Sequence, residues 1–302
     1  MPRFGSVVTA MVTPFADDGR VDHKVAAELA RHLVTNGSDG LVVAGTTGEG
    51  PVLSDAERVE LFKTVIGAVE VPVIASTGTN DTAHSVMLTE EAAKCGADGV
   101  LVVTPYYNRP SRAGLAAHFR TVAAATDLPV VLYDIPVRSG RRIGTELIVE
   151  LAHEVTNILA VKDATGDLPA AAVVVAETPE GFEVYSGDDA LTLPFLSVGG
   201  VGVISVASHW AGRLLADMIE CYRAGEVDRA AALNRRLAES YRFESSDEYP
   251  NPVPAKTACR ALGLQVGQCR LPHVPAPEDL DDLARSIIAR SGAAEAAQRS
   301  VA

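Results

Sequence analysis

The sequence has few of the features on which several protein classes depend. Its 302 residues include four cysteines, which lie far apart and form no Cys-x-x-Cys pair: Cys95, Cys221, Cys259 and Cys269. This spacing is typical of scattered reduced thiols in a cytoplasmic protein. No apolar run approaches the roughly 18 residues of a membrane-spanning helix, and the N-terminus, MPRFGSVV, lacks the layout of a signal peptide. The sequence therefore predicts a soluble, unexported protein.

Positive charge is scarce as well. Lysine and arginine together number 26 against 39 aspartates and glutamates, which gives a formal net charge of −13. A strongly acidic chain binds a phosphate backbone poorly, so we expect no nucleic-acid partner. The seven histidines form no His-x-His or His-Glu-x-x-His cluster, so we expect no metal site. The remaining balance, 47% hydrophobic and 22% charged residues, is that of an ordinary globular protein.

Eight short apolar runs follow one another along the chain. They cover residues 6–11, 40–44, 72–77, 99–104, 129–133, 158–162, 182–186 and 201–206. Because they are apolar almost throughout, they are typical of strands that are covered on both faces. Helical segments lie between them, with start signals such as Asp22 and the Ser54–Glu57 capping box. Eight strand–helix repeats predict an α/β fold, the (β/α)8 or TIM barrel. An open doubly wound sheet is the alternative, although it would normally have fewer strands.

Further helical patterns follow the eighth run. They cover residues 226–243, 254–262 and 277–289, and Pro250, Pro252 and Pro254 interrupt the chain between the first two. We therefore predict a catalytic barrel over residues 1–224 and a small helical C-terminal region over 225–292 that packs on it. Residues 293–302, rich in Ala and Ser, are predicted to fray.

Lys162 is the most informative single residue. The chain has only five lysines, and Lys162 alone lies within an apolar strand run. Burial there disfavours the ammonium form, and a neutral amine can attack a carbonyl carbon to form a Schiff base. The alternative is a strand-end lysine that pairs with the adjacent Asp163.

Other polar residues come at the ends of neighbouring strands, where a barrel places its chemistry. Thr46 and Thr47, set between glycines, offer hydroxyls and backbone N–H groups that suit a carboxylate. Tyr107 and Tyr133 are phenols that can pass a proton along a chain with Thr46, and Arg138 can bind a second carboxylate through two parallel hydrogen bonds. Each residue has an alternative interpretation without catalysis. Thr46 and Thr47 could belong to an ordinary loop, the two tyrosines could be packing residues, and Arg138 could be a solvated surface charge.

Six motifs carry a family resemblance. They are GTTGE at 45–49, TPYYNRP at 104–110, YDIPVRSG at 133–140, VKDATG at 161–166, SGDD at 186–189 and GVIS at 202–205. In this order and spacing the chain resembles the dihydrodipicolinate synthase family. That family belongs to a superfamily with N-acetylneuraminate lyase and the keto-deoxy-sugar-acid aldolases. The resemblance runs from about Val7 to the C-terminal helices.

The resemblance implies a role for each residue. It implies a Schiff base between Lys162 and pyruvate, with Thr46, Tyr133 and a Tyr107 from the neighbouring subunit as the proton relay. It further implies that Thr47 binds the pyruvate carboxylate and Arg138 that of L-aspartate 4-semialdehyde. Backbone contacts beside the lysine would come from Gly187 and Ile204.

The implied activity is a lyase-type synthase reaction of lysine and diaminopimelate biosynthesis. Its product is 4-hydroxy-tetrahydrodipicolinate, and it needs no cofactor besides the covalent Schiff base. Members of the family are usually cytoplasmic homotetramers, built as two tight dimers. Arg138 and Thr47 favour a synthase over a pyruvate-dependent aldolase or lyase of the superfamily acting on N-acetylneuraminate or a 2-keto-3-deoxy sugar acid. A barrel that binds keto acids without turnover is the third possibility.

Two further segments depart from the family pattern. In lysine-sensitive relatives, lysine binds in a cleft at the dimer interface, and here the matching residues are Asn80, Tyr106, Arg58 and His84. A carboxylate is usual at the position of His84, so its loss and the added charge of Arg58 predict weak lysine inhibition. Near Tyr249, residues 248–252 read as if one residue were inserted, and we expect this segment to lie outside the chemistry.

Overall fold

The computed structural model describes residues 2–244 and 246–293. Eight parallel strands pair in chain order, and the first pairs with the last, which closes a barrel. The strands are β1 (Val7–Ala10), β2 (Gly40–Val43), β3 (Val73–Ser76), β4 (Gly99–Val103), β5 (Val130–Asp134), β6 (Ile158–Asp163), β7 (Glu183–Ser186) and β8 (Gly202–Ser205). All eight predicted runs contain a strand, so the barrel prediction is confirmed. The open sheet is wrong, because Val8 of β1 pairs with Ile204 of β8.

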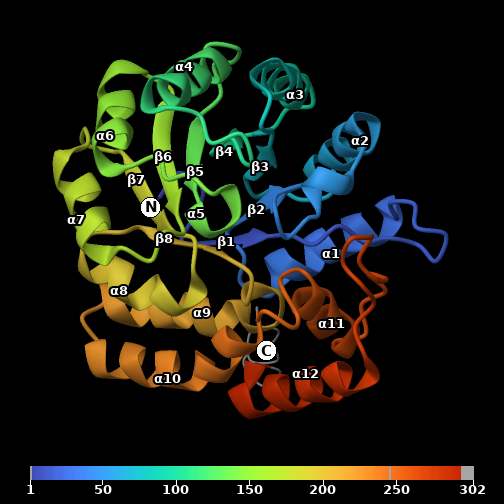
Figure 1. Ribbon diagram of the computed structural model, residues 1–302. Coiled ribbons are helices and arrows are strands. Elements are labelled where there is room, and N and C mark those ends of the chain that lie inside the picture. The colour runs from blue at the N-terminus through green and yellow to red at the C-terminus, as the bar shows by residue number, and fades with distance from the viewer. Residues whose placement is uncertain (1, 245, 294–302) are drawn as a thin grey trace.

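Helices follow the strands and surround the barrel (Figure 1). They are α1 (His23–Thr35), α2 (Asp55–Ile66), α3 (Thr82–Lys94), α4 (Arg112–Ala123), α5 (Pro136–Ser139), α6 (Thr145–Glu154), α7 (Leu168–Glu177), α8 (Thr192–Ser197) and α9 (Ser208–Arg223). The predicted start signals are present. Asp22 caps α1 by accepting the N–H of Val25, and Ser54 and Glu57 form the full capping box of α2. Each cap satisfies backbone donors that the first helical turn leaves unpaired.

Two apolar layers arise because successive side chains of a strand point to opposite faces of the sheet. One layer fills the barrel and includes Val8, Leu101 and Tyr133. The other lies between the strands and the surrounding helices and includes Leu29, Phe62 and Phe119. Residues on the inner layer at the carboxyl ends of the strands therefore face the mouth of the barrel, where active sites of this fold lie.

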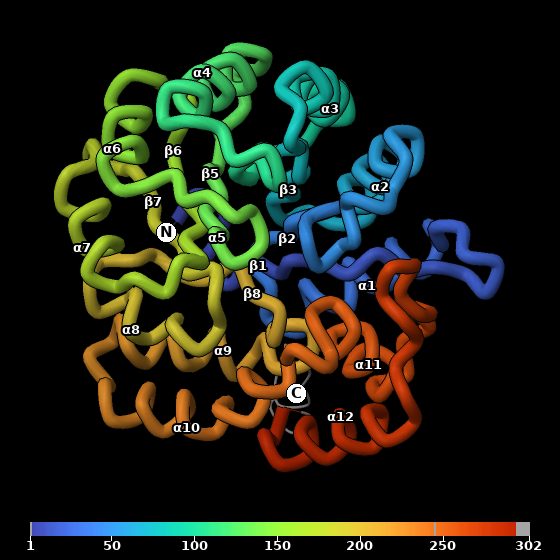
Figure 2. The backbone as a smooth tube through the Cα atoms, viewed as in Figure 1, coloured from blue at the N-terminus to red at the C-terminus, as the bar shows by residue number. Residues whose placement is uncertain are grey.

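The C-terminal helices α10 (Val227–Phe243), α11 (Val253–Ala261) and α12 (Glu278–Ser291) lie together on one side of the barrel, beside α8, α9 and α1 (Figures 1 and 2). The indole of Trp210 on α9 meets the ring of Phe243 edge to face at 5.8 Å between centroids. Ala255 and Cys259 of α11 join the layer that covers the barrel. Helix α11 thus connects the barrel with the other C-terminal helices.

The division at residues 224 and 225 stays a prediction, and the predicted frayed tail lies outside the described residues apart from Ala293. Within the described part of the chain, no helix combines the length and the hydropathy needed to cross a membrane.

Candidate active site

Lys162 lies at the end of β6 with its side chain inside the barrel. The residue is 5% exposed, and its Nζ lies 4.5 Å from the centre of the Tyr133 ring on the neighbouring strand. Gly187, at the end of β7, makes this approach possible. A Cβ there would come within 3.1 Å of Cγ of Lys162 and 2.8 Å of Cβ of Ala164. Gly187 therefore lies directly beside the lysine, as the family resemblance implies.

The alternative pairing of Lys162 with Asp163 does not occur. Adjacent strand residues project to opposite faces, and the Asp163 carboxylate accepts the N–H of Thr165 at 2.8 Å. Within residues 2–244 and 246–293, the Lys162 amine forms no ion pair. Burial raises the pKa of Asp163, and raises that of the adjacent Asp134 to about 6. The amine is therefore buried without a direct carboxylate partner, which is the arrangement that a nucleophilic lysine requires.

The turn that follows β2 places Thr46 and Thr47. Two non-glycine residues in the left-handed region bracket it, Ala44 at φ 57° and Glu49 at φ 55°. The N–H of Glu49 donates to the Thr46 carbonyl at 3.0 Å. Such conformations cost free energy and are concentrated at functional sites. The turn leaves Thr46 partly exposed and buries Thr47 to 3% exposure.

A cavity of about 320 Å³ brings several predicted residues together. Thr46, Tyr133 and Arg138 line it, with Tyr106 and Arg58. Arg138 lies on α5, whose first residue is Pro136, immediately beyond β5. The volume falls in the range of sites for small organic molecules. Three residues that are widely separated in sequence therefore meet at one concave surface, as predicted from the strand ends.

Five of the predicted catalytic and substrate-binding residues do not line the 320 Å³ cavity: Lys162, Thr47, Tyr107, Gly187 and Ile204. Tyr107 is 90% exposed with φ 73°, and it is not among the residues that line the 320 Å³ cavity. Ile204 is 1% exposed and belongs to the layer inside the barrel. A single copy of the chain therefore does not bring the Tyr107 phenol to Thr46 and Tyr133.

The segment around Tyr249 lies closer to the predicted site residues than we expected. We expected residues 248–252 to lie outside the chemistry, yet the Asn251 side-chain amide donates to Oγ1 of Thr47 at 3.0 Å. The Arg138 guanidinium donates to the Asn251 carbonyl at 3.2 Å. The segment therefore contacts two predicted site residues that lie 204 and 113 positions away in the sequence, and whether it takes part in the chemistry stays a prediction. The sequence signal was weak, a single amide between two prolines.

A second buried lysine was also missed. Lys256 on α11 is fully buried, and its Nζ pairs with Oε1 of Glu49 at 2.7 Å. The same Nζ donates to the Gln268 carbonyl at 2.9 Å and lies 4.0 Å from the centre of the Phe15 ring. Burial lowers the pKa of Lys256. Its amine is occupied by the Glu49 carboxylate and the Gln268 carbonyl, which gives Lys256 a structural role as an anchor of the turn that carries Thr47.

The residues of the expected effector cleft have different hydrogen-bond and ion-pair partners. Arg58 is 5% exposed, donates to the Gly50 carbonyl at 2.6 Å and lines the 320 Å³ cavity with Tyr106. Nε2 of His84 instead lies 2.8 Å from Oδ1 of Asp55. The carbonyl of Asn80 accepts a hydrogen bond from the Asn108 side chain at 2.8 Å.

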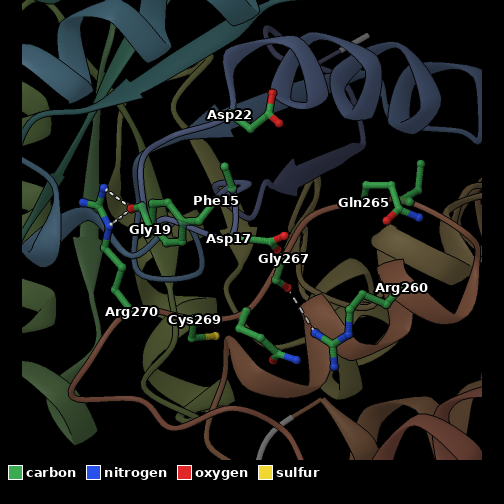
Figure 3. Close-up of a pocket in the computed structure, with 12 residues that line it drawn as sticks. Phe15, Asp17, Gly19, Asp22, Arg260, Gln265, Gly267, Cys269 and Arg270 are labelled. Carbon is green, nitrogen blue, oxygen red and sulfur yellow. Dashed lines mark hydrogen bonds between the residues drawn. The ribbon is translucent and has the colours of Figure 1, made fainter.

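A larger cavity, about 700 Å³, contains none of the predicted site residues. It lies between the loop after β1 and the segment after α11, and Figure 3 shows Phe15, Arg260 and Arg270 in its wall. Arg260 already pairs with Asp281 at 3.0 Å, and Arg270 with Glu57 at 2.5 Å. Size alone therefore does not locate the site. In the part of the chain that is described, no group of three or more His, Cys, Asp or Glu side chains is placed to hold a metal ion.

In the described residues, the closed barrel buries the Lys162 amine beside Tyr133 at the carboxyl ends of its strands and without an ion pair, an arrangement that suits a lyase of the Schiff-base class. Comparison with known proteins specifies the family. The sequence profile described as "Dihydrodipicolinate synthetase family" matches residues 3–290, and the chain belongs to this family.

Relatives that carry a curated name are similar over nearly their whole length. The 4-hydroxy-tetrahydrodipicolinate synthase of Bacillus subtilis is 49% identical over 278 residues, which cover 91% of this chain and 95% of that protein. The enzyme of the same name from Symbiobacterium thermophilum is 47% identical over 294 residues, covering 97% and 99%. Among solved structures, the lysine-bound synthase of Cyanidioschyzon merolae superposes with a TM-score of 0.93 at 43% identity, covering 97% of this chain and all of that one.

Proposed function

We propose that the chain condenses pyruvate with L-aspartate 4-semialdehyde and releases 4-hydroxy-tetrahydrodipicolinate. The observation that carries the proposal is the Lys162 amine, buried without an ion pair and 4.5 Å from the centre of the Tyr133 ring. The names of the B. subtilis and S. thermophilum relatives support the same activity. The reaction belongs to the biosynthesis of diaminopimelate and lysine.

The chemistry begins at the Lys162 amine. It attacks the keto carbon of pyruvate, water leaves, and the resulting iminium withdraws electrons from the adjacent methyl group. Loss of a methyl proton gives an enamine, whose carbon attacks the aldehyde of the second substrate. The amine of that substrate then displaces Lys162 by transimination and closes the ring. No cofactor takes part, because the iminium itself is the electron sink.

The other residues bind substrates and move protons. Tyr133 lies beside the imine and exchanges protons through Thr46 and Tyr107. Thr47 binds the pyruvate carboxylate, and Arg138 binds the carboxylate of the aldehyde substrate. Backbone groups of Gly187 and Ile204 complete the site next to the lysine.

A coupled assay with pyruvate and aspartate semialdehyde tests this function. We expect pyruvate consumption only when aspartate semialdehyde is present, followed by appearance of the cyclic product. Pyruvate release from N-acetylneuraminate or a 2-keto-3-deoxy sugar acid would instead identify an aldolase of the superfamily. Pyruvate binding without turnover of any aldehyde would identify a keto-acid-binding barrel.

We further propose that the active form is a homotetramer of two tight dimers, in which Tyr107 enters the neighbouring site. Its 90% exposure and left-handed backbone support this placement, because they hold the phenol away from its own chain. Two inactive variants, Tyr107→Phe and Lys162→Ala, are then expected to regain part of the activity when mixed and reassembled. A mixed dimer has one site with both Lys162 and the partner's Tyr107. Failure to regain activity, with subunit exchange confirmed by mass, would place Tyr107 in its own site.

Lysine is expected to inhibit weakly. The Arg58 cation is buried at the cavity, and His84 stands where lysine-sensitive relatives have a carboxylate. Loss of a charge-assisted hydrogen bond costs about 1.5–3 kcal/mol, roughly ten- to a hundredfold in affinity. A lysine titration at fixed substrate concentrations measures the effect. Half-inhibition below about a millimolar would contradict the expectation.

A further inference from the structure

The hydroxyl of Thr47 has a defined direction. Thr47 is 3% exposed and Asn251 7% exposed, and the Asn251 amide donates to Thr47 Oγ1 at 3.0 Å. A threonine hydroxyl has one hydrogen, and an oxygen that accepts from the amide must donate that hydrogen in another direction. Within the described residues, no acceptor takes this hydrogen. Because buried donors are seldom left without a partner, the Thr47 hydroxyl is set to donate to a bound ligand.

The same asparagine also contacts Arg138. The guanidinium donates to the Asn251 backbone carbonyl at 3.2 Å and lines the 320 Å³ cavity. A carbonyl oxygen orients a guanidinium without neutralising its charge. Within the described ranges Arg138 forms no ion pair, so its charge stays available for a ligand carboxylate.

The position of Asn251 is fixed by the helix that follows it. Helix α11 begins two residues later, at Val253, and carries Lys256. Lys256 pairs with Glu49 at 2.7 Å, and Glu49 lies two residues after Thr47 in the same turn. The turn is therefore contacted twice, by Lys256 of α11 through an ion pair and by Asn251 just before α11 through its side-chain amide.

We propose that Asn251 is a positioning residue for both substrate carboxylates. Its side-chain amide turns the Thr47 hydroxyl hydrogen toward the pyruvate carboxylate, and its carbonyl holds Arg138 for the carboxylate of the second substrate. The inference rests on the proposed function, since Thr47 and Arg138 receive carboxylates only if the chain acts on these two acids.

A double-mutant cycle tests the hydroxyl direction. Thr47→Val and Asn251→Ala are each expected to raise the KM for pyruvate about ten- to a hundredfold, the range for a hydrogen bond to a charged group. In the double variant the KM is expected to equal that of Thr47→Val, because no hydroxyl remains to be directed. Asn36→Ala, which removes a half-buried amide at the end of α1, is the matched control and is expected to leave KM unchanged.

The isosteric variant Asn251→Asp tests the mechanism if Asn251→Ala folds poorly. An aspartate accepts the Thr47 hydroxyl and turns its hydrogen away from the ligand. We expect the pyruvate KM of Asn251→Asp to rise at least as far as that of Asn251→Ala. In the Thr47→Val background the substitution is expected to raise KM by a smaller factor, because only the added negative charge then acts.

The two proposals fail differently. If Thr47→Val leaves the pyruvate KM unchanged, the carboxylate assignment of the proposed function is wrong, and the role of Asn251 is overturned with it. A different result is that Thr47→Val raises the pyruvate KM while Asn251→Ala causes the same fold-increase in KM in the Thr47→Val background as in the wild-type protein. In that case the role of Asn251 alone is overturned.

Discussion

Lys162→Ala is expected to abolish the condensation and the covalent adduct with pyruvate. Borohydride added with pyruvate reduces the iminium to a stable secondary amine, which adds mass at one lysine. Without the amine no electron sink forms, and the expected loss in kcat is at least about a thousandfold, as for removal of other covalent nucleophiles. Peptide mass mapping of the reduced adduct, with a rate measurement on the variant, checks both parts.

Lys24→Ala is the matched control, because the Lys24 side chain is 85% exposed at the surface of α1. It is expected to retain the adduct and the activity. Lys256 is the informative competitor, since it is the other deeply buried lysine. A reduced adduct on Lys256 or on any lysine other than Lys162 would overturn the mechanism.

Lys256→Met is expected to destabilise the fold strongly. The substitution leaves the Glu49 carboxylate buried and without its cation, which typically costs about 3–5 kcal/mol. For a chain of this size, such a loss corresponds to a fall of roughly 10 °C in the unfolding midpoint. The double variant Lys256→Met with Glu49→Gln removes the buried charge altogether and is expected to recover part of the loss. Thermal unfolding followed by circular dichroism checks both variants.

Lys63→Met is the surface comparison. Lys63 and Glu60 lie 3.7 Å apart on α2 with more than half of each side chain exposed. Such pairs contribute about 0–1 kcal/mol, so the midpoint is expected to change little. A Lys256→Met variant that unfolds at the same temperature as Lys63→Met would show that the buried ion pair does not stabilise the turn.

The predictable part of the structure depends on local patterns. Each of the eight strands has its own apolar run, and parallel strands bring their carboxyl ends to one edge. Thr46, Tyr133 and Arg138 line one cavity, and their closeness could therefore be expected without knowledge of the rest. The starts of α1 and α2 could be predicted in the same way, because Asp22 and Ser54 each cap the first turn of the helix that directly follows them.

The missed contacts join distant segments. The Asn251 amide reaches Thr47 from 204 residues away, and Lys256 reaches Glu49 from the C-terminal helices. The spacing of apolar residues along the chain does not show which loop a later helix will contact. Lys256 also lies in a helix that begins with prolines and small residues, so its full burial had no strand pattern to reveal it.

The proposed site joins two parts of the chain, the strands of the barrel and the segment that leads into α11. Lys162 lies on a strand of the barrel, whereas Thr47 and Arg138, which we propose to bind the carboxylates, contact Asn251 just before α11. A substitution in the segment before α11 is therefore expected to change how the two acids bind while the nucleophilic lysine keeps its place on the barrel.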